Sequence, residues 1–80
     1  MPVSRASKNI LVIGGSGFIG SHTADALSKK GHKVTILDKV SSPWLKKDQK
    51  MIIGNMMDQD ILNSSMRDID YIYYFAGIAD

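Results

Sequence analysis

Residues 10–22, "ILVIGGSGFIGSH", decide the fold, because an apolar run is followed at once by four glycines in seven positions. The run Asn9–Ile13 is rich in β-branched residues and predicts a strand that is buried on both faces. Glycine costs roughly 0.5–1 kcal/mol relative to alanine inside regular structure. Glycines at this density therefore indicate that something approaches the backbone closely where the strand ends.

The spacing of these glycines is G-x-x-G-x-x-G, and it falls between an expected strand and an expected helix. Gly14 would let the chain turn sharply, Gly17 would let a pyrophosphate approach the start of the helix, and Gly20 would let the helix pack tightly on the sheet. The alternative is a plain strand-to-helix turn, which needs one glycine rather than three. No G-K-[ST] sequence follows, which excludes a P-loop nucleotidase.

A carboxylate ends the second expected strand. That strand covers residues 33–37, and Asp38 follows it, 24 residues after Gly14. A carboxylate at this place can accept hydrogen bonds from both hydroxyls of an adenosine ribose. It would repel a 2′-phosphate, so NAD is favoured over NADP, although the cation of Lys39 could partly accommodate that phosphate. The alternative is that Asp38 is a turn residue only.

The rest of the chain alternates between helices and strands. We expect a helix from residue 19 to about 30, a loop over 39–49, a short strand over 50–53, a helix over 59–66 and a strand over 71–75. Their order predicts an α/β fold, namely the first mononucleotide-binding half of a Rossmann-type doubly wound parallel sheet, and analogy with such folds implies the strand order 3-2-1-4.

The order of elements also predicts the division of the chain, the cap of the second helix and the helix faces that pack on the sheet. Residues 1–8 are expected to be a flexible tail, and residues 9–80 an incomplete NAD(P)-binding domain. Asp58 is expected to cap the second helix. The residues expected to face the sheet are Ile19, Thr23, Ala26 and Leu27 in the first helix and Ile61, Leu62 and Met66 in the second.

Composition excludes several classes of protein. The chain has no cysteine, which excludes a disulfide framework and a thiolate metal site. The net charge of +2 comes without a basic stripe that carries aromatic residues, so we expect no nucleic-acid partner. No stretch has the length of a secretory or membrane-spanning segment, so we expect a cytoplasmic protein without membrane contact. His22 and His32 have no third ligand in the pattern, so no metal site is expected.

Four motifs occur in a familiar order: "GGSGFIGSH", the acidic residue in "TILDK", "GNMMD" and "YYFAGIAD". Together they resemble the N-terminal part of the extended short-chain dehydrogenases/reductases, and among these the NAD-dependent sugar-nucleotide epimerases and dehydratases. The resemblance covers residues 9–80. It implies NAD as cofactor, a nucleotide-sugar substrate for a longer parent protein, and transient hydride transfer to bound NAD.

The resemblance also implies roles for individual residues. Phe18 and Ile19 would offer backbone N–H groups to the pyrophosphate, Asp38 and Lys39 would hold the adenosine ribose, Asn55 and Met56 would contact the adenine, and Phe75, Ala76 and Gly77 would line the channel towards the nicotinamide ribose. Two positions depart from the family. Ile13 stands where threonine is common, and Asn55 replaces an aspartate, which weakens the expected hydrogen bond to adenine.

The family's catalytic pair is absent from this sequence. The pair is Tyr-x-x-x-Lys, but the residues four positions after the tyrosines are Phe75, Gly77 and Ile78. We therefore expect no catalytic residue here and no turnover by these 80 residues, with the tyrosines in the core or on a sheet face. A non-catalytic dinucleotide-binding or redox-sensing module is the alternative. Another is an extended reductase or a hydroxysteroid-type dehydrogenase.

The edge of the last expected strand is a further feature. An uncovered strand edge is a template for pairing with another chain. We therefore also expect self-association as a homo-oligomer, or a partner that supplies the missing half of the sheet.

Overall fold

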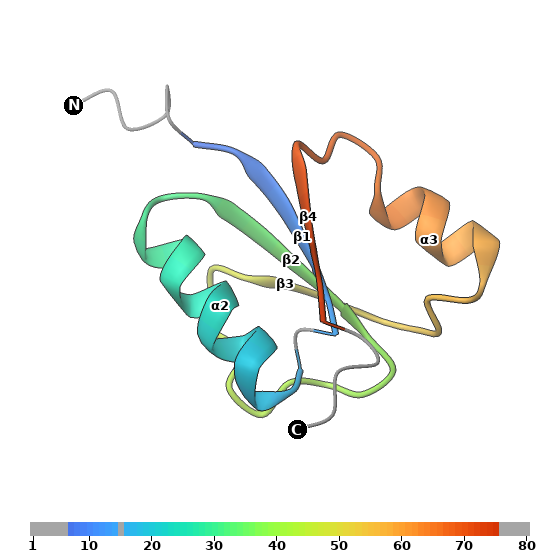
Figure 1. Cartoon of the computed structure of the whole chain (residues 1–80), viewed down its shortest axis with the longest axis horizontal. Helices are drawn as coiled ribbons and strands as arrows, with labels where there is room; N and C mark the ends of the chain where they lie inside the picture. Colours follow the sequence, from blue (N-terminus) through green and yellow to red (C-terminus); the bar gives the residue numbers. More distant parts are fainter. Residues whose placement is uncertain (1–6, 15, 76–80) are drawn as a thin grey trace.

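The computed structural model describes residues 7–14 and 16–75, which form a parallel sheet with a helix on each face (Figure 1). The elements follow in the order β1 (Asn9–Ile13), α2 (Phe18–Lys29), β2 (Lys33–Asp38), β3 (Lys50–Ile53), α3 (Gln59–Ser65) and β4 (Tyr71–Tyr74). All strand pairs are parallel, and the strand order is β3-β2-β1-β4. This confirms the predicted α/β fold and the predicted strand order.

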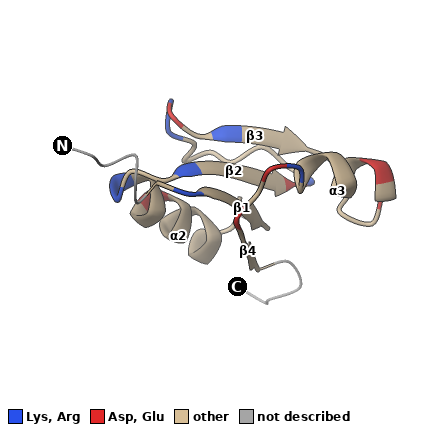
Figure 2. Cartoon of the chain, turned by 90° about the horizontal axis from the view of Figure 1, so that it is seen from above, with Lys and Arg blue, Asp and Glu red and all other residues tan. Residues whose placement is uncertain are grey.

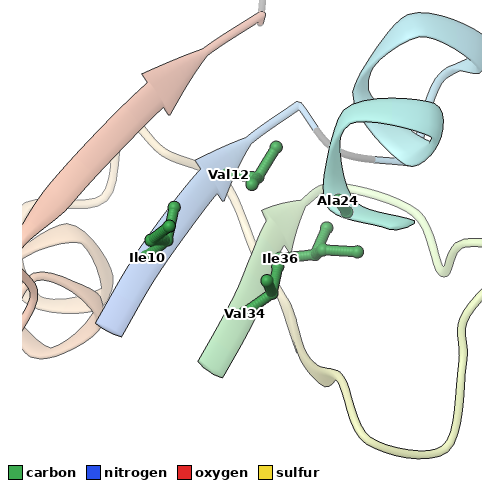
Figure 3. Close-up of a cluster of buried hydrophobic side chains, with 5 residues drawn as sticks. All are labelled: Ile10, Val12, Ala24, Val34 and Ile36. Atoms are coloured by element: carbon green, nitrogen blue, oxygen red, sulfur yellow. The ribbon is translucent and has the colours of Figure 1, made fainter. Parts of the chain in front are cut away.

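The two faces of β1 build two separate apolar clusters. On the α2 face, Ile10, Val12, Val34 and Ile36 pack with Ala24 (Figure 3). On the α3 face, the cluster consists of Leu11, Ile13 and Leu37, with partly buried side chains around them. Alternate side chains of a strand point to opposite faces of the sheet, so a continuous apolar strand fills both clusters. The prediction of a strand buried on both faces is confirmed for β1.

Helix α2 presents a different face to the sheet from the one predicted. Its buried residues are Gly20, Ser21 and Ala24, whereas Ile19 is 45% exposed and Ala26 is also exposed. The predicted stripe followed the larger apolar residues. Small side chains line the buried face instead, and small residues allow a helix axis to lie close to a sheet. Of the predicted stripe, Thr23 is half-buried and Leu27 packs against the first cluster.

Helix α3 is capped as predicted. The Asp58 carboxylate accepts hydrogen bonds from the backbone N–H groups of Asp60 at 3.0 Å and Ile61 at 3.3 Å. Ile61 packs with its neighbour Leu62 against the second cluster. The prediction for Met66 is wrong, because this residue forms the C-cap and its side chain is 41% exposed.

Strand β4 is exposed along its whole length. Its four residues, Tyr71, Ile72, Tyr73 and Tyr74, are between 40% and 57% exposed. Within the described ranges, β4 pairs with β1 only and lies at the edge of the sheet (Figure 2). The tyrosines therefore lie on a sheet face, and the alternative that they belong to the core is wrong.

Hydrogen bonds tie the segment before β1 to the turn that follows α2. The Ser7 hydroxyl donates to the Gly31 carbonyl at 2.9 Å, and the Lys8 N–H donates to His32 Nδ1 at 3.1 Å. His32 is thus a hydrogen-bond acceptor for the backbone. No helix in the described ranges combines the length and the apolar character needed to cross a lipid bilayer.

Candidate dinucleotide-binding site

The loops that carry the predicted site residues leave the sheet at the carboxyl ends of its strands. Gly14 N–H donates to the Leu37 carbonyl at 2.8 Å, Gly54 N–H donates to the last carbonyl of β2 at 2.9 Å, and Phe75 N–H donates to the Ile13 carbonyl at 2.7 Å. The carboxyl ends of parallel strands lie on the same side of the sheet, and open α/β sheets bind ligands there. The topology therefore brings together segments that are up to 61 residues apart in the sequence, from Gly14 to Phe75.

The glycine turn has the geometry that its sequence predicts. Gly14 has a φ of 83°, a left-handed conformation that is readily available to glycine. Gly17 is the N-cap of α2 and has extended backbone angles, φ −77° and ψ 176°. Residues other than glycine also adopt these angles, so the backbone conformation does not require glycine here. Gly15 lies outside the described residues.

The start of α2 has backbone donors that no carbonyl of the helix itself can accept. Ser21 N–H donates to the Gly17 carbonyl at 2.9 Å and forms the first bond of the helix. The three preceding N–H groups, of Phe18, Ile19 and Gly20, have no partner within the helix. Within the described ranges no side chain caps this end, and no acidic residue stands in the first turn. Such an end favours an anion through its N–H groups and the helix dipole.

The first two side chains of α2, Phe18 and Ile19, are exposed. Phe18 is 61% exposed, and its ring packs edge-on against the ring of His22 with centroids 4.4 Å apart. The contribution of Phe18 to a ligand would therefore come from its backbone, as the resemblance implies.

Asp38 lies directly beside the glycine turn. Its Oδ2 accepts a hydrogen bond from Ser16 N–H at 3.0 Å, and its Oδ1 accepts one from Lys39 N–H at 2.6 Å. Asp38 is partly exposed, and Lys39 is exposed. The structure thus joins the two parts of the predicted site, the glycine turn and the carboxylate at the end of the second strand.

Ser16 is a site residue that the sequence pattern does not reveal. Its side chain is buried, with 6% exposed, and its Oγ donates to the Val40 carbonyl at 2.6 Å. In the glycine motif this position accepts many residue types, so spacing does not distinguish it. A small polar residue between Gly14 and Gly17 was the only available signal.

Asn55 and Met56 follow β3 and point in different directions. Asn55 is exposed, and its Oδ1 accepts a hydrogen bond from Met57 N–H at 2.9 Å in a local turn. A carbonyl oxygen has a second lone pair, so a ligand donor could still share it. Met56 packs against the second apolar cluster, whereas Met57 is 79% exposed.

The last predicted segment is described only in part. Phe75 is partly buried and packs against the first cluster. Its main chain continues the pairing with β1 through the bond to the Ile13 carbonyl. Ala76 and Gly77 lie outside the described residues.

These residues fit a dinucleotide by their chemistry. The uncapped start of α2 suits a pyrophosphate, and the partly exposed carboxylate of Asp38 suits the neutral diol of a ribose. The Ser16–Asp38 hydrogen bond joins these two features, so one ligand with both groups could contact both.

Comparisons with known proteins agree with this chemistry. Residues 10–80 match the family described as "NAD dependent epimerase/dehydratase family". The chain is 41% identical over 83 aligned positions to the UDP-glucose 4-epimerase of Neisseria meningitidis serogroup A, and the match covers 89% of this chain and 24% of the relative. The chain therefore spans about a quarter of the length of this relative.

Solved structures show the same similarity. The UDP-glucose 4-epimerase of Thermotoga maritima with UDP-glucose matches with a TM-score of 0.80 and 32% identity, over 89% of this chain and 25% of that one. The Thermus thermophilus UDP-glucose 4-epimerase in complex with NAD also has a TM-score of 0.80, with 26% identity over 90% of this chain and 25% of that one.

Proposed function

The chain belongs to the NAD-dependent epimerase/dehydratase family, and we propose that it forms the NAD-binding segment of a UDP-sugar epimerase or dehydratase. The observation that carries this proposal is the hydrogen bond between Ser16 N–H and the Asp38 carboxylate. Through it, an anion-binding helix start and a ribose-binding carboxylate lie side by side.

The residues that would hold NAD divide by the part of the ligand that they contact. The N–H groups of Phe18 and Ile19 would donate to the pyrophosphate, and Gly17 would leave room for it. Asp38 would accept hydrogen bonds from the adenosine ribose hydroxyls. NADP is disfavoured, because its 2′-phosphate would face the negative charge of Asp38.

The further contacts extend along the carboxyl ends of the strands. We assign the adenine to Asn55 and Met56, and the channel towards the nicotinamide ribose to the segment that begins at Phe75. The role of Lys39 is to support the ribose from the exposed side of Asp38.

NAD would supply the redox chemistry, whereas the residues of this chain would bind and orient NAD. NAD, when bound, supplies an acceptor for a hydride from a sugar hydroxyl. The sequence contains no Tyr-x-x-x-Lys pair to move the hydroxyl proton. These 80 residues would therefore bind and orient the dinucleotide without turning over a substrate.

The UDP-sugar is proposed as the substrate of the longer protein. The Thermotoga maritima relative was solved with UDP-glucose, and the Neisseria meningitidis relative is a UDP-glucose 4-epimerase. A non-catalytic module is the competing reading, and it would be supported if a longer protein that carries this segment bound NAD but released no epimerised or dehydrated sugar.

Titration calorimetry with NAD tests the proposal. We expect the chain to bind NAD and the Gly17→Val variant to lose binding, because the valine side chain would occupy the space of the pyrophosphate. The extended angles of Gly17 are open to valine, so circular dichroism should show an intact fold. Ser41→Val, in an exposed loop, is the matched control and should bind as the parent does. Equal NAD affinity of Gly17→Val and the parent would contradict the assignment of the turn.

We also propose that β4 mediates self-association of this chain. β4 exposes four uncharged residues at the sheet edge, whereas the opposite edge strand, β3, begins with a lysine. Natural proteins protect edge strands with charged side chains. The edge formed by β4 lacks this protection, and a second copy could pair along it.

A further inference from the structure

Ser16 makes two hydrogen bonds, one to the last residue of β2 and one to the segment that follows β2. Its N–H donates to Asp38 Oδ2 at 3.0 Å, and its hydroxyl donates to the Val40 carbonyl at 2.6 Å. The side chain is buried, so water does not compete strongly for this hydroxyl. One residue of the glycine turn thus holds the segment 38–40 at two points.

From this geometry we infer that Ser16 is a positioning residue that sets the selectivity for the adenosine ribose. The inference rests on the proposed function, since it concerns how Asp38 recognises a dinucleotide. Ser16 itself has its hydroxyl committed to the protein backbone and acts through Asp38. The Ser16 hydroxyl already has a partner in the protein, whereas the first N–H groups of α2 have no partner within the helix and can donate to a ligand.

The two bonds restrict the carboxylate in different ways. The backbone bond from Ser16 and the one from Lys39 N–H occupy one lone pair on each carboxylate oxygen. They orient the carboxylate and leave further lone pairs for a ribose diol. The hydroxyl bond holds the chain after Asp38 against the turn, which limits how far the Asp38 carboxylate can move.

Loss of the hydroxyl would loosen both restrictions. In Ser16→Ala the N–H remains, but the Val40 carbonyl loses its partner and the segment after β2 gains freedom. Asp38 would then meet the ribose less well oriented, and its carboxylate would oppose a 2′-phosphate less directly. We therefore expect Ser16→Ala to lower the ratio of NAD affinity to NADP affinity, in addition to lowering the stability of the chain.

Calorimetry on the whole chain with NAD and with NADP provides the first test. We expect Ser16→Ala to reduce the NAD-to-NADP affinity ratio by about threefold to tenfold, the range of one lost hydrogen bond. The control is Ser64→Ala, which removes a similar hydroxyl-to-carbonyl bond in α3, from Ser64 to Ile61 at 3.1 Å. It should leave the ratio unchanged.

A double-mutant cycle separates positioning from a general structural effect. If Ser16 acts through Asp38, Ser16→Ala should not change the ratio further once Asp38→Ala is present. An unchanged ratio in Ser16→Ala, or an equal reduction with and without Asp38, would overturn the inference. Failure of the parent chain to bind NAD would instead overturn the proposed function, and the inference with it.

A spectroscopic test does not depend on the folding of any Ser16 variant. In the parent chain the amide proton resonance of Ser16 should lie downfield, because this amide donates a hydrogen bond to the Asp38 carboxylate. In Asp38→Ala the resonance should move upfield, while the amide of Ser64 serves as the reference. A Ser16 amide resonance that is the same in the parent and in Asp38→Ala would contradict the bond on which the inference rests.

Discussion

Gln49 and Asp25 are joined by a hydrogen bond between the loop 39–49 and helix α2. The Gln49 side chain is buried, and its Nε2 donates to Asp25 Oδ1 at 3.1 Å and to Ser28 Oγ at 3.0 Å. Its Oε1 accepts a bond from Lys46 N–H at 3.1 Å. This amide therefore holds the far end of the loop whose near end is held by Ser16.

Replacement of this amide by a carboxylate should destabilise the chain. In Gln49→Glu the side chain loses both donated bonds and places a negative charge beside Asp25. We expect a loss of about 2–3 kcal/mol in the free energy of unfolding, measured by urea denaturation. Gln59→Glu is the matched control, because the Gln59 amide is exposed and donates to Asn63 at 3.2 Å. A change of equal size in both variants would show that the buried network contributes little.

Asp38 should control the choice between NAD and NADP. Removal of its carboxylate in Asp38→Ala should reduce the preference for NAD by roughly 1–3 kcal/mol, the range for hydrogen bonds to a charged group. Calorimetry with both dinucleotides measures this difference. Asp48→Ala removes the same charge from an exposed position in the following loop and should leave the preference in place. If the preference survives in Asp38→Ala, this residue serves the turn alone.

Gly54 should be required for the close packing of α3. A Cβ at this position would lie 2.8 Å from Ile61 Cδ1 and 3.2 Å from Ile61 Cγ2. We expect Gly54→Ala to destabilise the chain by about 1–3 kcal/mol through overpacking. Ile61→Val, which removes the Cδ1 atom, should relieve part of this cost, so the double variant should lose less stability than the sum of the two single variants. Additive losses in thermal unfolding would argue against this contact.

The β4 edge should make sedimentation of the chain depend on concentration. We expect the weight-average sedimentation coefficient to rise with concentration, and Ile72→Lys to suppress the rise because a charge at a strand edge opposes pairing. Ile53→Lys, at a 60% exposed position of the opposite edge strand β3, is the control and should still associate. A monomeric boundary at every concentration would refute association through β4.

The order of elements could be predicted from the sequence, because it depends on local patterns. The glycine spacing, the β-branched run Asn9–Ile13 and the carboxylate at the end of β2 are each visible within a few residues. Parallel pairing then follows where a helix connects two strands, because such a crossover returns the chain to the end of the sheet at which the first strand began. The α/β fold and the Asp58 cap follow from such patterns, whereas the order β3-β2-β1-β4 was predicted by analogy with doubly wound sheets.

Contacts between distant residues depended on the tertiary structure alone. Ser16 and Val40 lie 24 positions apart, as do Asp25 and Gln49, and no local pattern indicates that either pair meets. The helix face was also decided there, since the sheet accepts Gly20 and Ala24 rather than the larger Ile19. The physical reason is that burial is a property of what surrounds a side chain, and a sequence specifies the side chain but not its neighbours.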